Sequence, residues 1–240
     1  SRWLRNLRAW RPSCMERLSA PVETSSSAAL EPLPQQPKIQ ELRRIVLPGG
    51  SHVVLAAGSV LDFVGDVFVN AANEGCVAGF GIDEFVNKSG GFKLKEARKL
   101  LGGCPTGEAR LTPSFDHSNT RLIIHAVGPV YRVNALKDGI SAGTPEADAL
   151  LLAKDPLLTS AYSASMKLAH ENKVETIAFC LLSAGVFRGE KPLVDVVTLG
   201  LQAISAAVYD GLREVYLVAY TEEEQQVLVS VAAELYPESC

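Results

Sequence analysis

The segment from Val67 to Gly91, VFVNAANEGCVAGFGIDEFVNKSGG, constrains the fold of this chain more than any other. A short apolar strand ends in the sequence NAAN, a loop of small residues follows, and a segment with helical periodicity begins at Asp83. In α/β proteins a strand, a glycine loop and a helix in this order form an anion site, because loop N–H groups and the positive end of the helix face one ligand. Glycine also permits a close approach of the backbone to a ligand. A phosphate site requires neither the two Asn residues of NAAN nor the carboxylate of Asp83. Their presence therefore favours a ligand in which a sugar lies beside phosphates.

Length and composition limit the number of domains and the classes of partner. At 240 residues the chain is long enough for one domain with a tail, or for two small domains at most. Its 47% of hydrophobic and 21% of charged residues indicate a globular protein. The net charge of −4 gives no overall attraction to nucleic acid or to an anionic membrane, so we expect neither as a partner. Five Cys without CxxC spacing indicate reduced thiols of an intracellular protein.

Residues 1–38 differ from the rest and are predicted to form a disordered or targeting N-terminal extension. The first nineteen residues carry five Arg and a single acidic residue, and a stretch rich in Ser, Ala, Pro and Gln follows. An Arg-rich amphipathic start before a Ser-rich segment resembles an organelle transit peptide, which would direct the protein to mitochondria or another organelle. The alternatives are a disordered tail or an artificial leader before a natural start at Met15, and we then expect the cytosol or the nucleus.

Residues 39–240 are predicted to form one domain with an α/β fold. Strands alternate with helices, which favours a three-layer α/β/α sandwich with a mixed, mostly parallel sheet. The nearly continuous apolar runs LIIHAV and TIAFCLL are typical of strands covered on both faces. Residues 134–150 resemble a variable insertion. We predict strands at 44–47, 53–57, 66–69, 109–112, 122–127, 176–182 and 214–220, and helices at 82–88, 92–101, 156–171, 195–209 and 222–236.

Three predicted strand ends carry candidate binding residues, and ligands of α/β sheets bind beyond the carboxyl ends of strands. The first is the NAAN segment, the second is the small-residue loop at 183–189, and the third places Tyr220 at a strand terminus. Two glycine loops on adjacent strands suit a diphosphate, and a tyrosine suits stacking on a base. The GxxxxGK[ST], GxGxxG, HExxH and GxSxG motifs are absent, and so is paired Cys/His spacing. We therefore expect a nucleotide-diphosphate site with no metal and no cofactor.

The combined motifs resemble the macrodomain family, in the branch of ADP-ribose-binding hydrolases that includes the MacroD enzymes and the viral macrodomains. That branch carries NAAN, a spacer, a glycine run, and then a hydrophobic residue followed by Asp, which correspond here to 70–73, 78–81 and 82–83. GCPTGEA at 103–109, HAVGP at 125–129 and LSAGVF at 182–187 are similar to further family elements. The resemblance runs in order over roughly residues 50–236 and implies the macrodomain fold.

The resemblance implies roles for individual residues. Asn73 and Asp83 are implied as catalytic residues: Asn73 would bind the distal ribose hydroxyls, and Asp83 would orient or activate the attacking water. Whether Asp83 or a substrate phosphate acts as the base stays open, because an ordinary carboxylate is a weak base at neutral pH. The loop at 183–187 would hold the diphosphate, and Tyr220 would stack on adenine. The implied ligand-binding residues are Ser59, Val60, Asn70, Ala72, Gly79, Phe80, Gly81, Ser183, Ala184, Gly185, Val186, Phe187 and Tyr220.

The implied activity is hydrolysis of mono-ADP-ribose from Asp or Glu side chains of proteins, with deacetylation of O-acetyl-ADP-ribose as a second reaction. The expected partners are ADP-ribose and mono-ADP-ribosylated proteins, and we expect a monomer. A non-catalytic ADP-ribose reader and a phosphatase acting on ADP-ribose 1″-phosphate are the alternatives.

Two positions depart from the family pattern. Ser59 stands where the family usually has an Asp that accepts from the adenine amino group, and Asp62 is close enough in sequence to substitute. Phe80 interrupts the glycine run and is expected to narrow the distal-ribose pocket or to shift the water. Two residues are expected to serve packing: His125 as a hydrogen-bonded core histidine, and Cys76 as a small apolar group.

Overall fold

The computed structural model describes residues 39–237 except 48, 78, 134–138 and 142. The chain divides into residues 1–35 and residues 36–240, and all the described residues belong to the second unit. The predicted extension at 1–38 lies outside the described residues. The strands are β1 (Gln40–Val46), β2 (His52–Ala57), β3 (Gly65–Ala71), β4 (Ala109–Pro113), β5 (Thr120–Ala126), β6 (Thr176–Cys180) and β7 (Glu214–Ala219). The helices are η2 (Val60–Asp62), α2 (Ile82–Leu100), α4 (Pro145–Leu152), α5 (Asp155–Glu171), α6 (Leu193–Ala206) and α7 (Glu222–Leu235).

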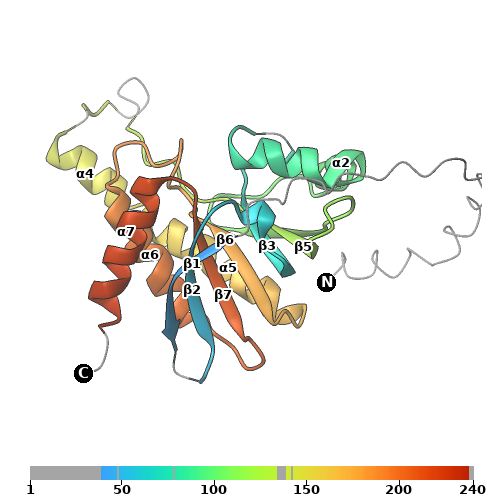
Figure 1. Cartoon of the computed structure of the whole chain (residues 1–240). Coiled ribbons are helices and arrows are strands. Elements are labelled where there is room, and N and C mark those ends of the chain that lie inside the picture. Colours follow the sequence, from blue (N-terminus) through green and yellow to red (C-terminus); the bar gives the residue numbers. More distant parts are fainter. Residues whose placement is uncertain (1–38, 48, 78, 134–138, 142, 238–240) are drawn as a thin grey trace, which may run out of the picture. The chain divides into compact units, whose positions relative to one another are not determined.

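The strands form one seven-stranded sheet in the order β1-β2-β7-β6-β3-β5-β4 (Figure 1). The five central strands are mutually parallel, while β1 and β4 pair antiparallel with their neighbours at the two edges. The prediction of an α/β fold with a mixed, mostly parallel sheet is confirmed. Because β3 lies between β6 and β5, the segments that follow these three strands emerge side by side at their carboxyl ends.

Alternate residues of the central strands pack on opposite faces of the sheet. On β3, Phe68 joins a cluster with residues of α2 and η2, while Val67 and Val69 join the main core with residues of α4, α5, α6 and α7. The sheet therefore lies between two helical layers, and Figure 1 shows α2 apart from α6 and α7. Asn70 follows Phe68 by two residues, so its buried side chain lies on the α2 face.

The two helices predicted at 82–88 and 92–101 are both present, because α2 consists of two helices joined across a break at Gly91, where φ is 69°. Two local differences from the sequence prediction have physical causes. The helix α4 begins at Pro145, inside the predicted insertion, and Thr144 caps it by accepting from the Ala147 N–H. Strand β6 ends at Cys180 rather than at 182, because the chain turns there into the loop at 183–189.

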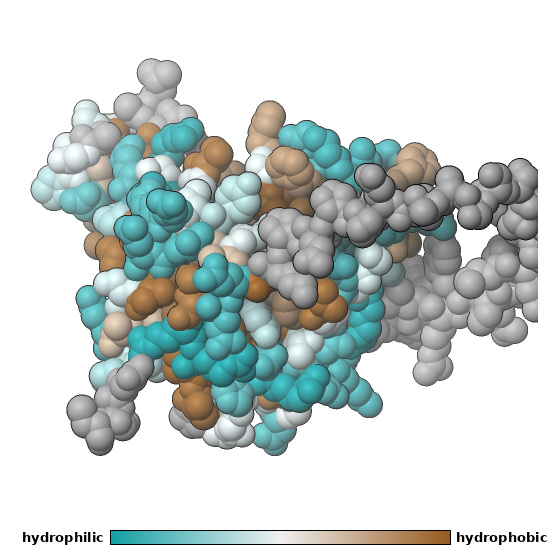
Figure 2. Space-filling model, viewed as in Figure 1, coloured by the Kyte–Doolittle hydropathy of each residue, from teal (hydrophilic) through white to brown (hydrophobic). Residues whose placement is uncertain are grey.

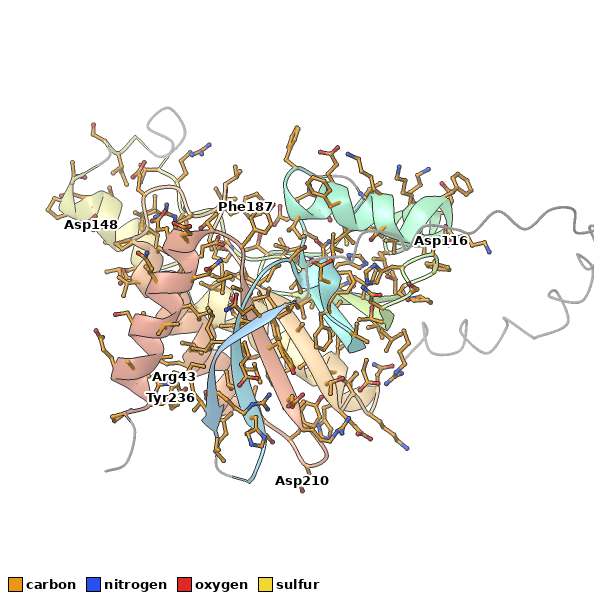
Figure 3. All side chains as sticks on the ribbon, in the orientation of Figure 1. Arg43, Asp116, Asp148, Phe187, Asp210 and Tyr236 are labelled. Carbon is orange, nitrogen blue, oxygen red and sulfur yellow. The ribbon has the colours of Figure 1, made fainter. Side chains whose placement is uncertain are left out.

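The two ends of the sheet carry different groups. Figure 3 shows Phe187 and Asp210 at opposite ends, since Phe187 follows β6 whereas Asp210 precedes β7. Arg43 of the edge strand β1 donates from Nη2 to the Tyr236 carbonyl at 2.6 Å, which ties β1 to the end of α7 (Figure 3). Hydrophilic residues cover much of the face in Figure 2, with hydrophobic residues between them. No described helix is both long enough and apolar enough to cross a membrane.

Candidate functional site

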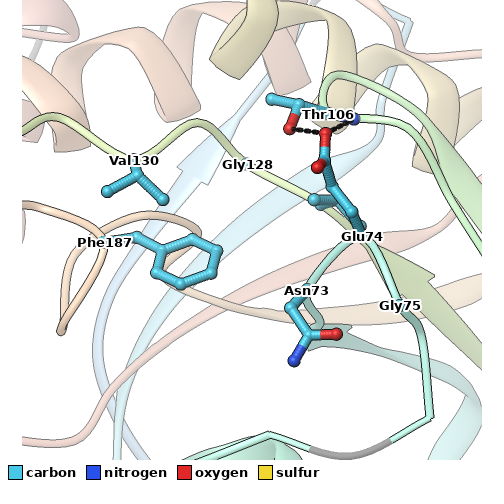
Figure 4. A pocket seen from close by; sticks show the side chains of 8 residues that line it. Asn73, Glu74, Gly75, Thr106, Gly128, Val130 and Phe187 are labelled. Carbon is cyan, nitrogen blue, oxygen red and sulfur yellow. Dashed lines mark hydrogen bonds between the residues drawn. The ribbon is translucent and has the colours of Figure 1, made fainter. Parts of the chain in front are cut away.

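A pocket of about 330 Å³ lies at the carboxyl ends of the central strands. Backbone hydrogen bonds bring its parts together: the Ala72 N–H donates to Ala126 at 2.8 Å, and the Gly107 N–H donates to Val127 at 2.8 Å. In Figure 4 the Phe187 side chain points across the pocket toward Asn73. The residues that line the pocket are Asn73, Glu74, Gly75, Thr106, Val127, Gly128, Val130 and Phe187.

Asn73 and Glu74 lie at the start of the loop between β3 and α2, which we call the first loop. Hydrogen bonds of their own side chains and backbone fix their conformation. Asn73 Oδ1 accepts from the Cys76 N–H at 3.1 Å, which holds the turn that follows the strand. Glu74 Oε1 accepts from Thr106 N at 3.2 Å and from Thr106 Oγ1 at 2.7 Å. The Glu74 carbonyl accepts from the Cys104 N–H at 2.9 Å. These bonds join the NAAN segment to the GCPTGEA segment, which lies thirty residues further along the chain.

The second loop, residues 183–189, is held mainly by its backbone. Ser183 has a φ of 57°, and its Oγ donates to the Pro129 carbonyl at 2.8 Å. The Phe187 carbonyl accepts from the Tyr131 N–H at 2.7 Å, and the Arg188 N–H donates to Gly185 at 2.9 Å. Among the described residues, the N–H groups of 185, 186 and 187 have no hydrogen-bond partner. Three successive donors without an acceptor form a site suited to an anion.

Asp83 lies beneath the first loop and does not line the pocket. Its side chain is buried at 1% exposure and is paired with Arg98, whose side chain is also fully buried, at 2.7 Å between Oδ1 and Nη2. Asn70 Nδ2 donates to the same oxygen at 2.5 Å. The other oxygen, Oδ2, is buried without a hydrogen bond, and a Cβ on Gly79 would lie 2.6 Å from it. The role of Asp83 in activating water stays a prediction, and this geometry gives the water no direct path to the carboxylate.

Arg98 connects Asp83 to the loop above it. Its Nε donates to the Cys76 carbonyl at 2.9 Å, and its Nη1 donates to Asn87 Oδ1 at 2.8 Å. Asn87 in turn donates to the Val77 carbonyl at 3.0 Å. A single buried guanidinium therefore holds both the backbone of the first loop and the first turns of α2.

His125 extends the buried network on the other side of Asn70. Asn70 Nδ2 lies 3.2 Å from His125 Nδ1, so Nδ1 is the acceptor and Nε2 donates to Thr112 Oγ1 at 2.9 Å. Burial, reinforced by the charge of Arg98, lowers the pKa of His125 well below its usual value, so the ring is neutral. Burial also raises the pKa of the Cys76 thiol, which lies in a small apolar cluster. The hydrogen-bonded core histidine and the packing role of Cys76 are both observed.

The remaining predicted residues lie around the pocket rather than in its lining. Gly81 precedes α2 with a φ of 65°, and the Phe80 side chain is 90% exposed. The Tyr220 side chain is 75% exposed at the end of β7. Ser59 accepts from the Leu61 N–H at 3.3 Å and so caps η2, while Val60 is buried. Ser59 and Tyr220 follow the paired strands β2 and β7, so they lie at neighbouring strand ends, and their role in binding adenine stays a prediction.

Sequence reasoning assigned roles to Asn73 and Phe187 but not to the other residues of the lining. Thr106 and Gly128 lie inside the quoted segments GCPTGEA and HAVGP, so these motifs already carried a signal for them. Glu74 and Val130 had no such signal, because only the folded chain shows which of their side chains face the pocket. Among the described residues no group of three or more His, Cys, Asp or Glu side chains could hold a metal ion.

The fold and the pocket define an α/β protein with a ligand site between two loops at the carboxyl ends of a parallel sheet. A family model described as "Macro domain" matches residues 69–196. A macro domain-containing protein of Caldanaerobacter subterraneus subsp. tengcongensis is 31% identical over 188 residues, which cover 76% of this chain and 97% of that protein. The chain belongs to the macrodomain family.

Two further relatives carry functional descriptions. An O-acetyl-ADP-ribose deacetylase of Escherichia fergusonii is 31% identical over 183 residues, covering 74% of this chain and 93% of that protein. A solved structure of a Trypanosoma brucei macrodomain in complex with ADP-ribose is 26% identical, with a TM-score of 0.63, and the match covers 80% of this chain and 73% of the other.

Proposed function

We propose that this macrodomain binds ADP-ribose and hydrolyses the ester that links mono-ADP-ribose to acidic side chains of proteins, with O-acetyl-ADP-ribose as a second substrate. The observation that carries the proposal is the pocket between Asn73 and Phe187, which adjoins the second loop and its three N–H groups that have no acceptor among the described residues. A deacetylase among the relatives and an ADP-ribose complex among the similar structures support the same ligand.

In this proposal the second loop holds the diphosphate. The N–H groups of 185–187 point to no protein acceptor among the described residues, and phosphate oxygens would supply that acceptor. Asn73 contacts the distal ribose in the pocket, and Phe187 packs on the same sugar from the opposite side (Figure 4). The exposed ring of Tyr220 stacks on adenine, while Ser59 lies at the neighbouring strand end.

Asp83 contributes by holding the first loop in place. Its carboxylate fixes Arg98, and Arg98 fixes the Cys76 carbonyl of the loop that carries Asn73. The Phe80 side chain is exposed and points away from the core. We propose that Phe80 covers the reacting end of a bound ligand rather than filling the pocket.

The hydrolase is tested with a protein substrate that carries ADP-ribose on Glu. We expect wild-type protein to release ADP-ribose from this substrate and acetate from O-acetyl-ADP-ribose. Tight binding of ADP-ribose in a calorimetric titration without release of either product would identify a reader and refute the hydrolase. Release of phosphate from ADP-ribose 1″-phosphate in place of these products would identify the phosphatase.

The diphosphate assignment is tested at Gly185, where an added Cβ meets no atom within 4 Å. Replacing Gly185 with Glu places a carboxylate beside the N–H groups of the second loop, so it competes with the diphosphate and repels it. We expect calorimetry to show at least a 100-fold loss of ADP-ribose affinity, which corresponds to about 2.7 kcal/mol. Gly185→Ala is the matched control and retains affinity. Equal affinities for the two variants would place the diphosphate elsewhere.

A further inference from the structure

Glu74 carries the only ionisable side chain among the eight described residues that line the pocket. The other seven are asparagine, glycine, threonine, valine and phenylalanine residues, which neither accept nor release a proton near neutral pH. In Figure 4 the Glu74 carboxylate lies on the Thr106 side of the pocket, and Phe187 points in from the other side. Any proton transfer between a substrate in this pocket and a protein side chain lining it therefore involves Glu74.

The Glu74 carboxylate is held in one orientation while keeping one oxygen available. Oε1 accepts both the backbone N–H and the hydroxyl of Thr106 (Figure 4). Oε2 has no hydrogen-bond partner among the described residues, and the residue as a whole is exposed. The Glu74 backbone is fixed as well, because its carbonyl accepts from Cys104. A carboxylate fixed through one oxygen presents the other in a defined direction, as a general base requires.

A second carboxylate, Asp83, lies beneath the first loop in the first turn of α2, and its situation is the opposite. Its Oδ1 is already occupied by Arg98 and Asn70, and its side chain does not reach the pocket lining. Its charge is compensated inside the protein, whereas that of Glu74 faces the ligand site. Of the two carboxylates, Glu74 is the one that a pocket water can reach without a change in the structure.

We propose that Glu74 is a catalytic residue of the hydrolysis, acting as the general base and then as the general acid; this inference rests on the proposed function. The water oxygen bonds to the ester carbonyl carbon, and one water proton passes to Glu74 Oε2. The bond between that carbon and the ribose oxygen then breaks, and the proton passes from Glu74 to the departing ribose oxygen. The products are ADP-ribose with a new hydroxyl group and the free acid of the side chain, or acetic acid.

The test uses the full chain with Glu74→Gln, in which the amide oxygen still accepts from Thr106 and so preserves the local structure. Single-turnover hydrolysis of the Glu-linked substrate is measured across pH, together with calorimetric titration of ADP-ribose. We expect the rate to fall by about 100-fold or more, the usual contribution of a general base, with the Kd for ADP-ribose changed by less than about threefold. The pH profile of the rate should flatten in the variant, because the amide of glutamine neither accepts nor releases a proton.

Glu108→Gln is the matched control, because Glu108 is an exposed carboxylate close in the chain to Thr106 that pairs with Arg110 and does not line the pocket. It should hydrolyse at the wild-type rate. A Glu74→Gln rate within threefold of wild type would overturn the proposal, as would a loss of rate matched by an equal loss of ADP-ribose affinity. If wild-type protein binds ADP-ribose but releases nothing, the proposed hydrolase itself fails, and that result is distinct from a fully active Glu74→Gln variant.

Discussion

The two loops that flank the pocket are stabilised by different forces. The first loop rests on a buried ion pair, since Arg98 contacts both Asp83 and the Cys76 carbonyl. Within the part of the chain that the structure describes, no buried ion pair lies beneath the start of the second loop, where Ser183 adopts a positive φ and donates to the Pro129 carbonyl. The first loop therefore depends on charge, and the second depends on the shape of its backbone and on close packing.

The two loops should therefore be destabilised by different kinds of substitution. Removing one partner of a buried ion pair leaves an uncompensated charge in a dry environment, which is costly. A close-packed turn tolerates the loss of a charge nearby but resists added volume, because interiors have little empty space. Substitutions that change charge alone or volume alone should therefore separate the two loops.

The largest effect is expected at the ion pair. Asp83→Ala leaves the guanidinium of Arg98 buried without its carboxylate, so the free energy of unfolding should fall by about 3–5 kcal/mol. Urea denaturation followed by circular dichroism measures this change. The double variant Asp83→Leu with Arg98→Met removes both charges and should recover a large part of the loss, because no unpaired charge remains.

Glu84→Ala is the control for Asp83→Ala. Glu84 is the next residue along α2, and it is exposed and paired with Lys88 on the surface, so its removal should leave the stability nearly unchanged. If Asp83→Ala proves as stable as Glu84→Ala, the first loop does not depend on the buried pair and the contrast between the loops is lost.

A smaller effect is expected from added volume beneath the second loop. A Cβ on Gly128 would collide with Ser183 Oγ, so Gly128→Ala must displace the hydroxyl that donates to Pro129. We expect a loss of about 1–3 kcal/mol in the free energy of unfolding. Gly185→Ala, where nothing lies within 4 Å of the new Cβ, should stay within about 0.5 kcal/mol of wild type. Equal stabilities of the two variants would show that the Ser183 turn adapts to added volume.

The secondary structure could be predicted from the sequence, because strands and helices follow from the local pattern of apolar residues. The consecutive buried residues of β5 and β6 agree with the apolar runs LIIHAV and TIAFCLL, which predicted strands covered on both faces, and the helices begin close to where periodicity placed them. The order of the strands could not be obtained from these patterns, since nothing local tells β3 to lie between β6 and β5. Resemblance to the macrodomain family implied the fold as a whole, and the strand order comes from the structure.

The site was only partly predictable, because the side chains of its residues serve different purposes in the folded chain. The spacing of Asn73 and Asp83 along the sequence suggested two residues that act together, yet the fold places one in the pocket and the other beneath the loop. The partner of Asp83 is Arg98, fifteen positions further along α2, and no local sequence pattern marks this arginine as a buried residue. Burial of Arg98 depends on how α2 packs on the sheet, which is a tertiary property.

The smallest effect on stability is expected from lowering the pH, because two buried histidines stay neutral in the folded chain. Burial lowers the pKa of His125 well below the ordinary value of about 6.5, and burial also lowers the pKa of His117. Below about pH 6.5 the unfolded chain therefore binds protons that the folded chain does not bind, so stability is lost as the pH falls toward the lowered pKa values and is retained above pH 6.5. For His125 alone, the loss at pH 5.5 relative to pH 7.5 is on the order of 1 kcal/mol.

Urea denaturation at these two pH values checks the sign and the size of the effect. His125→Gln keeps an acceptor for Asn70 and a donor for Thr112 but does not titrate, so the difference in stability between the two pH values should shrink by on the order of 1 kcal/mol. His117→Gln should remove a smaller part, because the charge of Asp62 opposes the effect of burial on His117. A wild-type protein that is equally stable at both pH values would mean that His125 binds its proton in the folded chain, and Arg98 would then have a second cation within the same network.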